Sequence, residues 1–328
     1  MRGIPFVAGL PVAPLARLGA SGAPMREFGE LAALVGDAAV TDVFVGAGRV
    51  WVDRGRGAEP TSLVLDERRV RALAVRLVEA GGRHVDEATP CVDVRLHDGV
   101  RVHVALPPVA VAGTQLSIRL PRTDALGLDA LEAAGAFVLV PRAAIDALVA
   151  RRANVLVSGA GGSGKTTLLG AMLSAAAPGE RIVTIEDVAE LRIRHEHVVA
   201  LQTRQANLEG AGEVDLARLV REALRMRPDR LVLGECRGAE IRELLAALNT
   251  GHDGGAGTLH ANALADVPAR LEALGALAGL SPDALARQAV SAFDAVLHVE
   301  RAGERRRVAA LGALAMRGGT LEVVDARE

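Results

Sequence analysis

The chain has 328 residues and a mass of 34.0 kDa, which is enough for one large domain or two ordinary ones. Half of the residues are hydrophobic and 24% are charged, so a core can be buried and global disorder is excluded. A net charge of -2, an aromatic content of 2% and the lack of tyrosine disfavour direct nucleic-acid binding through a basic surface or stacked bases.

The chain begins with an apolar stretch, Met1–Ala23, that three prolines interrupt. This pattern favours a partly disordered N-terminal extension over residues 1–39 rather than a signal peptide. The uncharged stretch Val102–Ile118 is too short and too polar to span a bilayer, which takes about 20 apolar residues. Cys91 and Cys236 lack the spacing of a metal site or a disulfide framework, which favours a reducing, cytoplasmic location.

Residues 40–120 mix both kinds of secondary structure and are predicted to form a small α+β domain. Val43–Val45 and Val50–Val52 flank a glycine-rich turn and indicate a β-hairpin. Apolar residues recur at helical spacing over 66–80 behind Asp66, a plausible N-cap. Alternating strands are predicted at 92–96, 101–106 and 115–120.

Residues 121–135 are predicted to be a linker and hinge, and a helical pattern follows over 141–151. Within 136–328, short runs that are almost wholly apolar indicate strands buried on both faces. These runs are 154–157, 182–185 and 231–233, and helical patterns separate them at 166–176, 215–226 and 240–248. The alternation predicts a doubly wound, mostly parallel α/β sheet. The run Arg305–Arg307 is expected to form a solvated turn.

The segment after the first apolar strand matches the pattern G-x-x-x-x-G-K-[ST] of a phosphate-binding loop, or P-loop. Glycines let the backbone wrap a phosphate, and the helix that follows adds the positive end of its dipole. Lys165 is the only lysine in the chain, and a lysine reaches the β- and γ-phosphates as a flexible point charge. The predicted nucleotide-binding residues are Gly159, Ala160, Gly161, Gly162, Ser163, Gly164, Lys165, Thr166 and Thr167.

The same loop indicates ATP and Mg²⁺ as its ligands. The guanine-specifying motif N-K-x-D needs a second lysine, which this chain lacks, so ATP is the expected nucleotide. Thr166 offers a hydroxyl to Mg²⁺.

Acidic residues follow two of the predicted strands. Glu186 and Asp187 come directly after 182–185, and Glu235 follows 231–233 through one glycine. Ligands of open α/β sheets bind at the carboxyl ends of the strands. We expect Glu186 to reach Mg²⁺ through water, and Glu235 to hold Mg²⁺ indirectly or to polarise the attacking water. Asp187 has the alternative role of a helix N-cap.

His260 ends a further short strand after the 240–248 helix and is placed to sense the γ-phosphate. His252 lies nearby, but with two histidines, no third ligand and no cysteine close in sequence, a zinc site is not expected.

These residues together resemble the ATPases of type II and type IV secretion, specifically the TadA/CpaF branch that drives Flp (tight-adherence) pili. The arginine- and alanine-rich composition resembles actinobacterial members of this branch, which are labelled conjugal-transfer-associated. The likeness runs from about Thr41 to about Leu297. Besides the P-loop it includes an Asp box at Thr184–Leu191, a Walker B segment at Leu224–Glu240, a His box at Asn249–Asn262, and the N-terminal segments 83–87, 92–101 and 116–119.

The resemblance implies a RecA-like ATPase domain behind a PAS-like α+β domain. It implies that Glu186 assists the metal, that Glu235 activates water, and that His260 couples the γ-phosphate to a subunit interface. Arg101 and Arg119 would close onto the nucleotide from the side opposite the P-loop. The family forms hexameric rings on the cytoplasmic face of the inner membrane, where they contact polytopic platform proteins and couple ATP hydrolysis to domain motion.

Two departures from the family pattern bear on function. Cys236 replaces a small aliphatic residue and is expected to fill space rather than to react. The Cys-x-x-Cys zinc knuckle of classical type II secretion ATPases is absent from the sequence, which favours the pilus and type IV branch. Two alternatives stay open, namely a DNA translocase of conjugation and a nucleotide-gated scaffold with little turnover.

Overall fold

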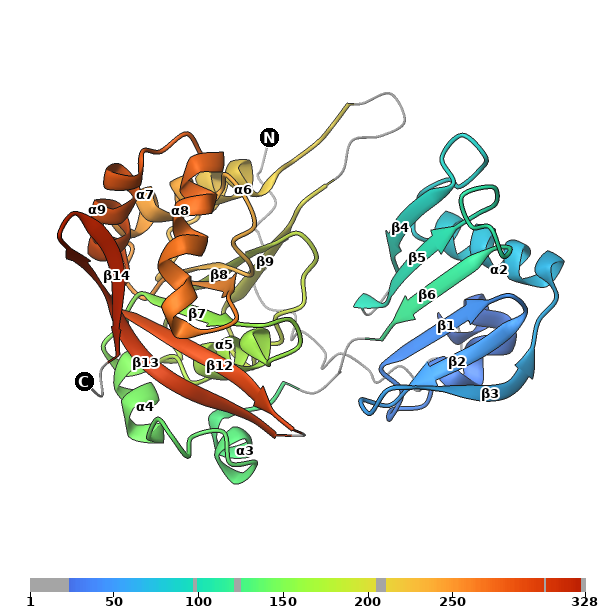
Figure 1. The fold of residues 1–328 in the computed structure, drawn as a ribbon, viewed down its shortest axis with the longest axis horizontal. Coiled ribbons are helices and arrows are strands. Elements are labelled where there is room, and N and C mark those ends of the chain that lie inside the picture. The colour runs from blue at the N-terminus through green and yellow to red at the C-terminus, as the bar shows by residue number, and fades with distance from the viewer. Residues whose placement is uncertain (1–23, 97–98, 121–124, 205–210, 304, 326–328) are drawn as a thin grey trace, which may run out of the picture. The chain divides into compact units, whose positions relative to one another are not determined.

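The computed structural model describes residues 24–96, 99–120, 125–204, 211–303 and 305–325. The chain divides into two compact units, residues 1–123 (unit 1) and residues 124–328 (unit 2), which are described separately (Figure 1). None of the helices in the described ranges is long and apolar enough to cross a membrane.

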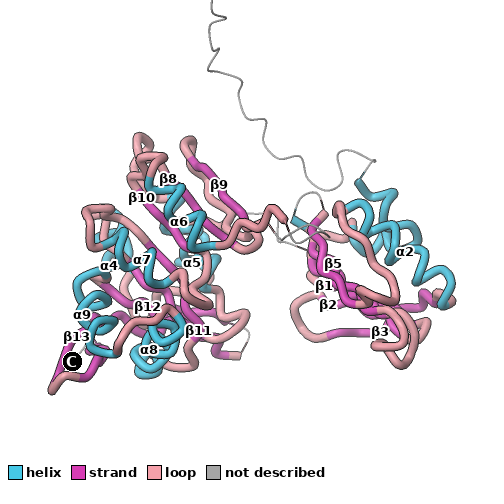
Figure 2. Tube along the Cα trace, turned by 90° about the horizontal axis from the view of Figure 1, so that it is seen from above, coloured by secondary structure: helices cyan, strands magenta, loops and turns pink. Residues whose placement is uncertain are grey.

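Unit 1 is built on a six-stranded antiparallel sheet with the order β3-β2-β1-β6-β5-β4. Helix α2 (Glu67–Ala80) lies along one face (Figure 2), and Asp66 caps it by accepting a hydrogen bond from the Arg69 amide at 2.8 Å. The strands are β1 (Asp42–Gly46), β2 (Arg49–Asp53), β3 (Ala58–Val64), β4 (Cys91–Arg95), β5 (Arg101–Ala105) and β6 (Gln115–Arg119).

The predicted hairpin, helix and three strands of unit 1 are confirmed, whereas β3 was not predicted. β3 carries Pro60 and is mostly exposed at the edge of the sheet, which is where a strand tolerates proline and lacks an apolar pattern.

The residues just before β1 belong to the core of unit 1. They form η1 (Pro24–Leu31) and α1 (Ala32–Val35), and they bury Phe28, Leu31 and Val35 against the sheet and α2. The described part of the expected N-terminal extension therefore packs on unit 1, while its residues 1–23 lie outside the described ranges.

Unit 2 contains an eight-stranded sheet with the order β14-β13-β12-β7-β11-β10-β8-β9. The strands from β12 to β9 in this order are parallel, and β13 and β14 add an antiparallel edge. This confirms the mostly parallel α/β sheet. The strands are β7 (Val155–Gly159), β8 (Ile182–Glu186), β9 (Val198–Gln202), β10 (Arg230–Leu233), β11 (Ala256–His260), β12 (Ala295–Ala302), β13 (Arg305–Arg317) and β14 (Thr320–Asp325).

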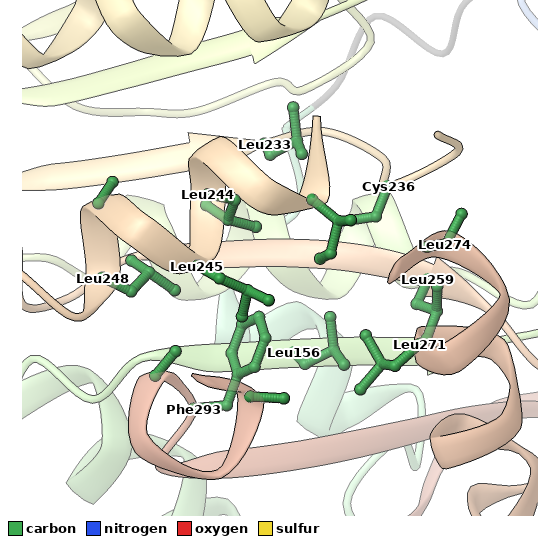
Figure 3. Close-up of a cluster of buried hydrophobic side chains, with 14 of the residues drawn as sticks. Leu156, Leu233, Cys236, Leu244, Leu245, Leu248, Leu259, Leu271, Leu274 and Phe293 are labelled. Atoms are coloured by element: carbon green, nitrogen blue, oxygen red, sulfur yellow. The ribbon is translucent and has the colours of Figure 1, made fainter. Parts of the chain in front are cut away.

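Helices cover both faces of this sheet, so each face has its own apolar core (Figure 1). One face carries α6 (Leu216–Leu224), α7 (Ile241–Leu248), η3 (Leu264–Asp266), α8 (Val267–Leu277) and α9 (Pro282–Ala292). Figure 3 shows part of that core, with Leu156 of β7 and Leu259 of β11 among the leucines of α7 and α8. The other face carries α3 (Leu128–Ala133), α4 (Arg142–Ala150) and α5 (Lys165–Ser174).

Two segments of unit 2 differ from the expectation. Helix α3 lies within the predicted linker 121–135, and its Leu128 is buried in the core beside α5. The run Arg305–Arg307 is not a turn, because it begins the thirteen-residue strand β13. Two of the four buried positions of β13 are the small residues Ala310 and Gly312, so its alternation gives only a weak strand pattern.

The buried cation Arg230 joins the start of β10 to two other segments of unit 2, at Val149 and Glu180. Its side chain is 5% exposed, and its Nη2 donates to Glu180 Oε1 at 3.2 Å and to the Val149 carbonyl at 2.8 Å. We expect Glu180→Ala to lower the free energy of unfolding by about 3 kcal/mol, since it leaves a buried guanidinium uncompensated. Urea denaturation of the variant and the wild type measures the loss.

The matched control is Glu222→Ala, which removes the carboxylate of a surface pair with Arg225 whose side chains are 46% and 77% exposed. Its expected loss is about 0.5 kcal/mol or less. Equal losses in the two variants would contradict a stabilising role for the buried pair.

Candidate functional site

The P-loop connects the central strand β7 to α5. All five residues of β7 are buried, and the loop that follows turns through Gly162 and Gly164, whose φ angles are 69° and 104°. Side chains are strained in that left-handed region, so both positions favour glycine. A Cβ at Gly159 would lie 2.3 Å from the Val299 carbonyl oxygen of β12, so this position has no room for a side chain. The glycines are therefore required by the shape of the loop.

Lys165 lies inside the loop and is 7% exposed. Its Nζ donates to the carbonyl oxygens of Gly159 at 2.9 Å and Ala160 at 3.0 Å, and it lies 3.5 Å from His260 Nε2. Burial lowers the pKa of Lys165, the Glu235 carboxylate raises it, and Arg237 lowers it. The ammonium group of Lys165 is thus held at the start of α5. Both this positive charge and the positive end of the helix dipole attract an anion to the loop.

The hydroxyl groups of the loop fit a nucleotide with its metal. Ser163 is 2% exposed, and its buried Oγ has no hydrogen-bond partner among the described residues. Thr166 is half-buried and Thr167 exposed in the first turn of α5. A buried hydroxyl without a partner costs free energy, which a phosphate oxygen or a metal-bound water would recover.

The adjacent parallel strands β8, β10 and β11 end at the same edge of the sheet and bring charged groups to the P-loop. Glu235 Oε1 lies 2.7 Å from His260 Nε2, and Glu235 Oε2 lies 2.6 Å from Arg237 Nη2. Burial and, next, the Lys165 charge lower the pKa of His260. This direction favours a neutral imidazole whose Nε2–H donates to the Glu235 carboxylate.

Glu186, at the end of β8, is 5% exposed and contacts the backbone that follows it. Its Oε1 accepts hydrogen bonds from the amides of Glu190 at 2.8 Å and Leu191 at 3.0 Å. The residues after Glu186 form no helix, so the alternative reading of Asp187 as a helix N-cap is wrong. Asp187 instead lies 3.9 Å from Arg237.

Arg101 and Arg119 belong to unit 1. They lie opposite each other on the neighbouring strands β5 and β6, and Arg95 lies opposite Arg101 on β4. The three arginines form a row on the face of the sheet opposite α2, since the residues that alternate with them are buried. A relation of this row to the nucleotide stays a prediction.

Sequence reasoning missed Arg237, although it stands two residues after Glu235. Glu240 holds the connecting loop, because its Oε1 accepts hydrogen bonds from the amides of Arg237 at 2.6 Å and Gly238 at 2.7 Å. Cys236 points the other way, into the apolar core (Figure 3), and burial raises the pKa of its thiol. This agrees with a space-filling cysteine and leaves its two neighbours at the site.

Comparison with known proteins places this arrangement in a family. Residues 25–301 match the family model described as "Type II/IV secretion system protein". A putative conjugal transfer protein of Mycobacterium tuberculosis H37Rv is 52% identical over 294 residues, covering 87% of this chain and 83% of that protein. The conjugal transfer protein TrbB of Rhizobium radiobacter is 32% identical over 285 residues and covers 85% of each chain.

A solved structure shares the fold. The crystal structure of the pilus retraction motor PilT with bound ADP has a TM-score of 0.61 at 20% sequence identity, and the match covers 90% of this chain and 82% of that one. The chain therefore belongs to the type II/IV secretion system protein family.

Proposed function

We propose that this protein is an ATPase that hydrolyses ATP to ADP and phosphate and serves as the motor of a secretion or pilus machine. The observation that carries the proposal is the meeting of Lys165, inside a glycine loop, with the Glu235–His260 pair from the neighbouring strands. A cation for the phosphates and a carboxylate for the attacking water thereby lie near the same atom, His260 Nε2.

The residues divide the work of phosphoryl transfer. When ATP binds, the Lys165 ammonium group leaves the carbonyl oxygens of Gly159 and Ala160 and contacts phosphate oxygens instead. The amides of the loop and the positive end of the α5 dipole attract the same phosphates. Thr166 and Glu186 would hold Mg²⁺, Glu186 partly through water, and the metal supplies charge neutralisation for the phosphates. Glu235 orients and deprotonates the attacking water.

Glu235 keeps acceptor sites for a water although both of its oxygens have a partner. One of its oxygens is engaged by His260 and the other by Arg237. A carboxylate has about four lone-pair sites, so Glu235 can also accept a hydrogen bond from the attacking water when a γ-phosphate is bound. His260, which lies between Lys165 and Glu235, is suited to sense that phosphate.

The proposed assembly is a homo-oligomeric ring, a hexamer, at the inner face of the cell membrane with platform proteins as partners. In this ring, hydrolysis is coupled to motion of the two units. A second candidate, a DNA-transfer ATPase, is favoured by the two relatives that are named conjugal transfer proteins. DNA-stimulated ATPase activity with a steep salt dependence distinguishes it from the pilus motor.

Lys165→Ala is expected to abolish nucleotide binding, because it removes the buried ammonium group from the loop. Lys165→Arg is the sharper variant, since it keeps the charge but places a bulky planar group where Nζ contacts two carbonyl oxygens. We expect Kd for a fluorescent ATP analogue to rise at least about a hundred-fold in both. Wild-type affinity in either variant, with an unchanged melting temperature of the nucleotide-free protein, would remove the P-loop assignment.

Glu235→Gln is expected to retain ATP binding and lose turnover. Loss of a general base costs about a hundred- to ten-thousand-fold in rate, and glutamine keeps the shape while losing the basic oxygen. Phosphate release by the purified oligomer, whose mass is determined by light scattering, measures the effect. Asp283→Asn, a matched amidation of an exposed carboxylate on α9, should leave turnover unchanged. Wild-type turnover in Glu235→Gln would exclude Glu235 as the base, and negligible wild-type turnover would favour the scaffold alternative.

Arg119→Ala is expected to lower turnover about ten-fold if this arginine contacts the phosphates. The matched control is Arg49→Ala, since Arg49 is an exposed arginine of β2 in the same sheet and lies outside the arginine row. Steady-state ATPase rates of the two variants give the comparison. Equal rates in Arg119→Ala and Arg49→Ala would leave Arg119 a surface residue.

A further inference from the structure

The hairpin formed by β12 and β13 contacts the P-loop region at three points. On its inner side, His298 Nδ1 lies 3.0 Å from Ser158 Oγ, directly before the loop. The Val299 carbonyl occupies the space where a side chain at Gly159 would be. From β13, Arg306 Nε donates to the Gly162 carbonyl oxygen at 3.1 Å, across 144 positions of sequence.

The Arg306 side chain lies against a second loop glycine as well. A Cβ at Gly164 would be 3.1 Å from Arg306 Cδ, so the aliphatic part of the arginine fills the space beside that glycine. Gly162 and Gly164 both have left-handed backbone, and the Arg306 side chain lies against both. Arg306 therefore contacts glycine positions of the loop, where the backbone has more conformational freedom than at residues with a side chain.

The three arginines of the run Arg305–Arg307 have different roles despite their adjacency. Arg307 pairs with Glu300 across the hairpin, with its Nε 2.7 Å and its Nη2 2.6 Å from Oε1. Arg305 is exposed at the start of β13. Arg306 alone of the three donates a hydrogen bond to the described part of the loop, at Gly162.

Strand β12 of the hairpin is held against β7 by contacts that do not involve Arg306. β12 pairs with β7 in parallel register, and the pairing of β12 with β13 shifts at His298 and Val299. His298 is 5% exposed, and burial lowers its pKa. The hairpin is thus anchored to the strand that leads into the loop, and Arg306 reaches the loop from a fixed base.

We propose that Arg306 is a positioning residue of the P-loop, which holds the Gly162–Gly164 segment in its binding conformation before the nucleotide arrives. Glycine-rich backbone loses much entropy when it is ordered around a ligand. A contact that orders the loop beforehand reduces that cost and so tightens binding. The consequence for ATP rests on the proposed function, whereas the contact itself concerns the nucleotide-free loop.

The test compares Arg306→Ala with Arg305→Ala, which removes the same charge from the same strand. In the absence of nucleotide, amide hydrogen exchange of peptides covering 159–167 is expected to be about five-fold faster in Arg306→Ala and unchanged in Arg305→Ala. In steady-state assays, Arg306→Ala should raise KM for ATP about five-fold while kcat stays within about two-fold. A loss of folded protein would lower kcat instead. Arg306→Lys keeps the charge but has no Nε–H, so it should also raise the exchange rate of 159–167 and KM for ATP.

Exchange in Arg306→Ala at the rate of Arg305→Ala overturns the proposal, as does an equal effect of both variants. If the wild type does not bind or hydrolyse ATP, the proposed function fails, and the exchange measurement still decides whether Arg306 holds the loop.

Discussion

The position of β7 in the middle of the unit 2 sheet is the constraint on which the site depends. β11 pairs with it on one side and β12 on the other, both in parallel. The loop after β7 therefore has neighbours on two sides, where the carboxyl end of a central strand opens a crevice. His260 reaches Lys165 from the β11 side, and His298 and Arg306 reach the loop region from the β12–β13 side. The β11 side thus brings charged groups to Lys165, and the β12–β13 side contacts the loop region.

Three charged groups and one imidazole form a short chain of contacts on the β11 side. Lys165 lies next to His260, His260 next to Glu235, and Glu235 next to Arg237. A neutral His260 between an ammonium and a carboxylate avoids a third adjacent positive charge, which agrees with its lowered pKa. A bound phosphate would add negative charge at one end, so the balance at Glu235 depends on what Lys165 holds.

Local patterns were enough to predict the P-loop and the strand-end residues, whereas contacts between distant segments were not. The loop has a fixed spacing, and Glu235 and His260 follow short apolar runs, so their place at one edge of a parallel sheet follows from topology. Arg306 could not be found in this way, because a run of arginines is typical of a solvated surface and its partner Gly162 is 144 positions away. Strand β13 was not predicted because two of its four buried positions are alanine and glycine, which weaken the apolar alternation.

Glu186 at the end of β8 shows why a glycine precedes Glu235, which follows β10. A Cβ at Gly234 would lie 2.5 Å from Glu186 Cγ, so a larger residue there would displace the Glu186 side chain. Glu186 in turn uses one oxygen to hold the amides of Glu190 and Leu191. The absence of a side chain at Gly234 therefore leaves room for Glu186 in its observed position. The sequence Gly-Glu is thus a packing requirement of Glu186 as well as part of the pattern that predicts Glu235 as the base.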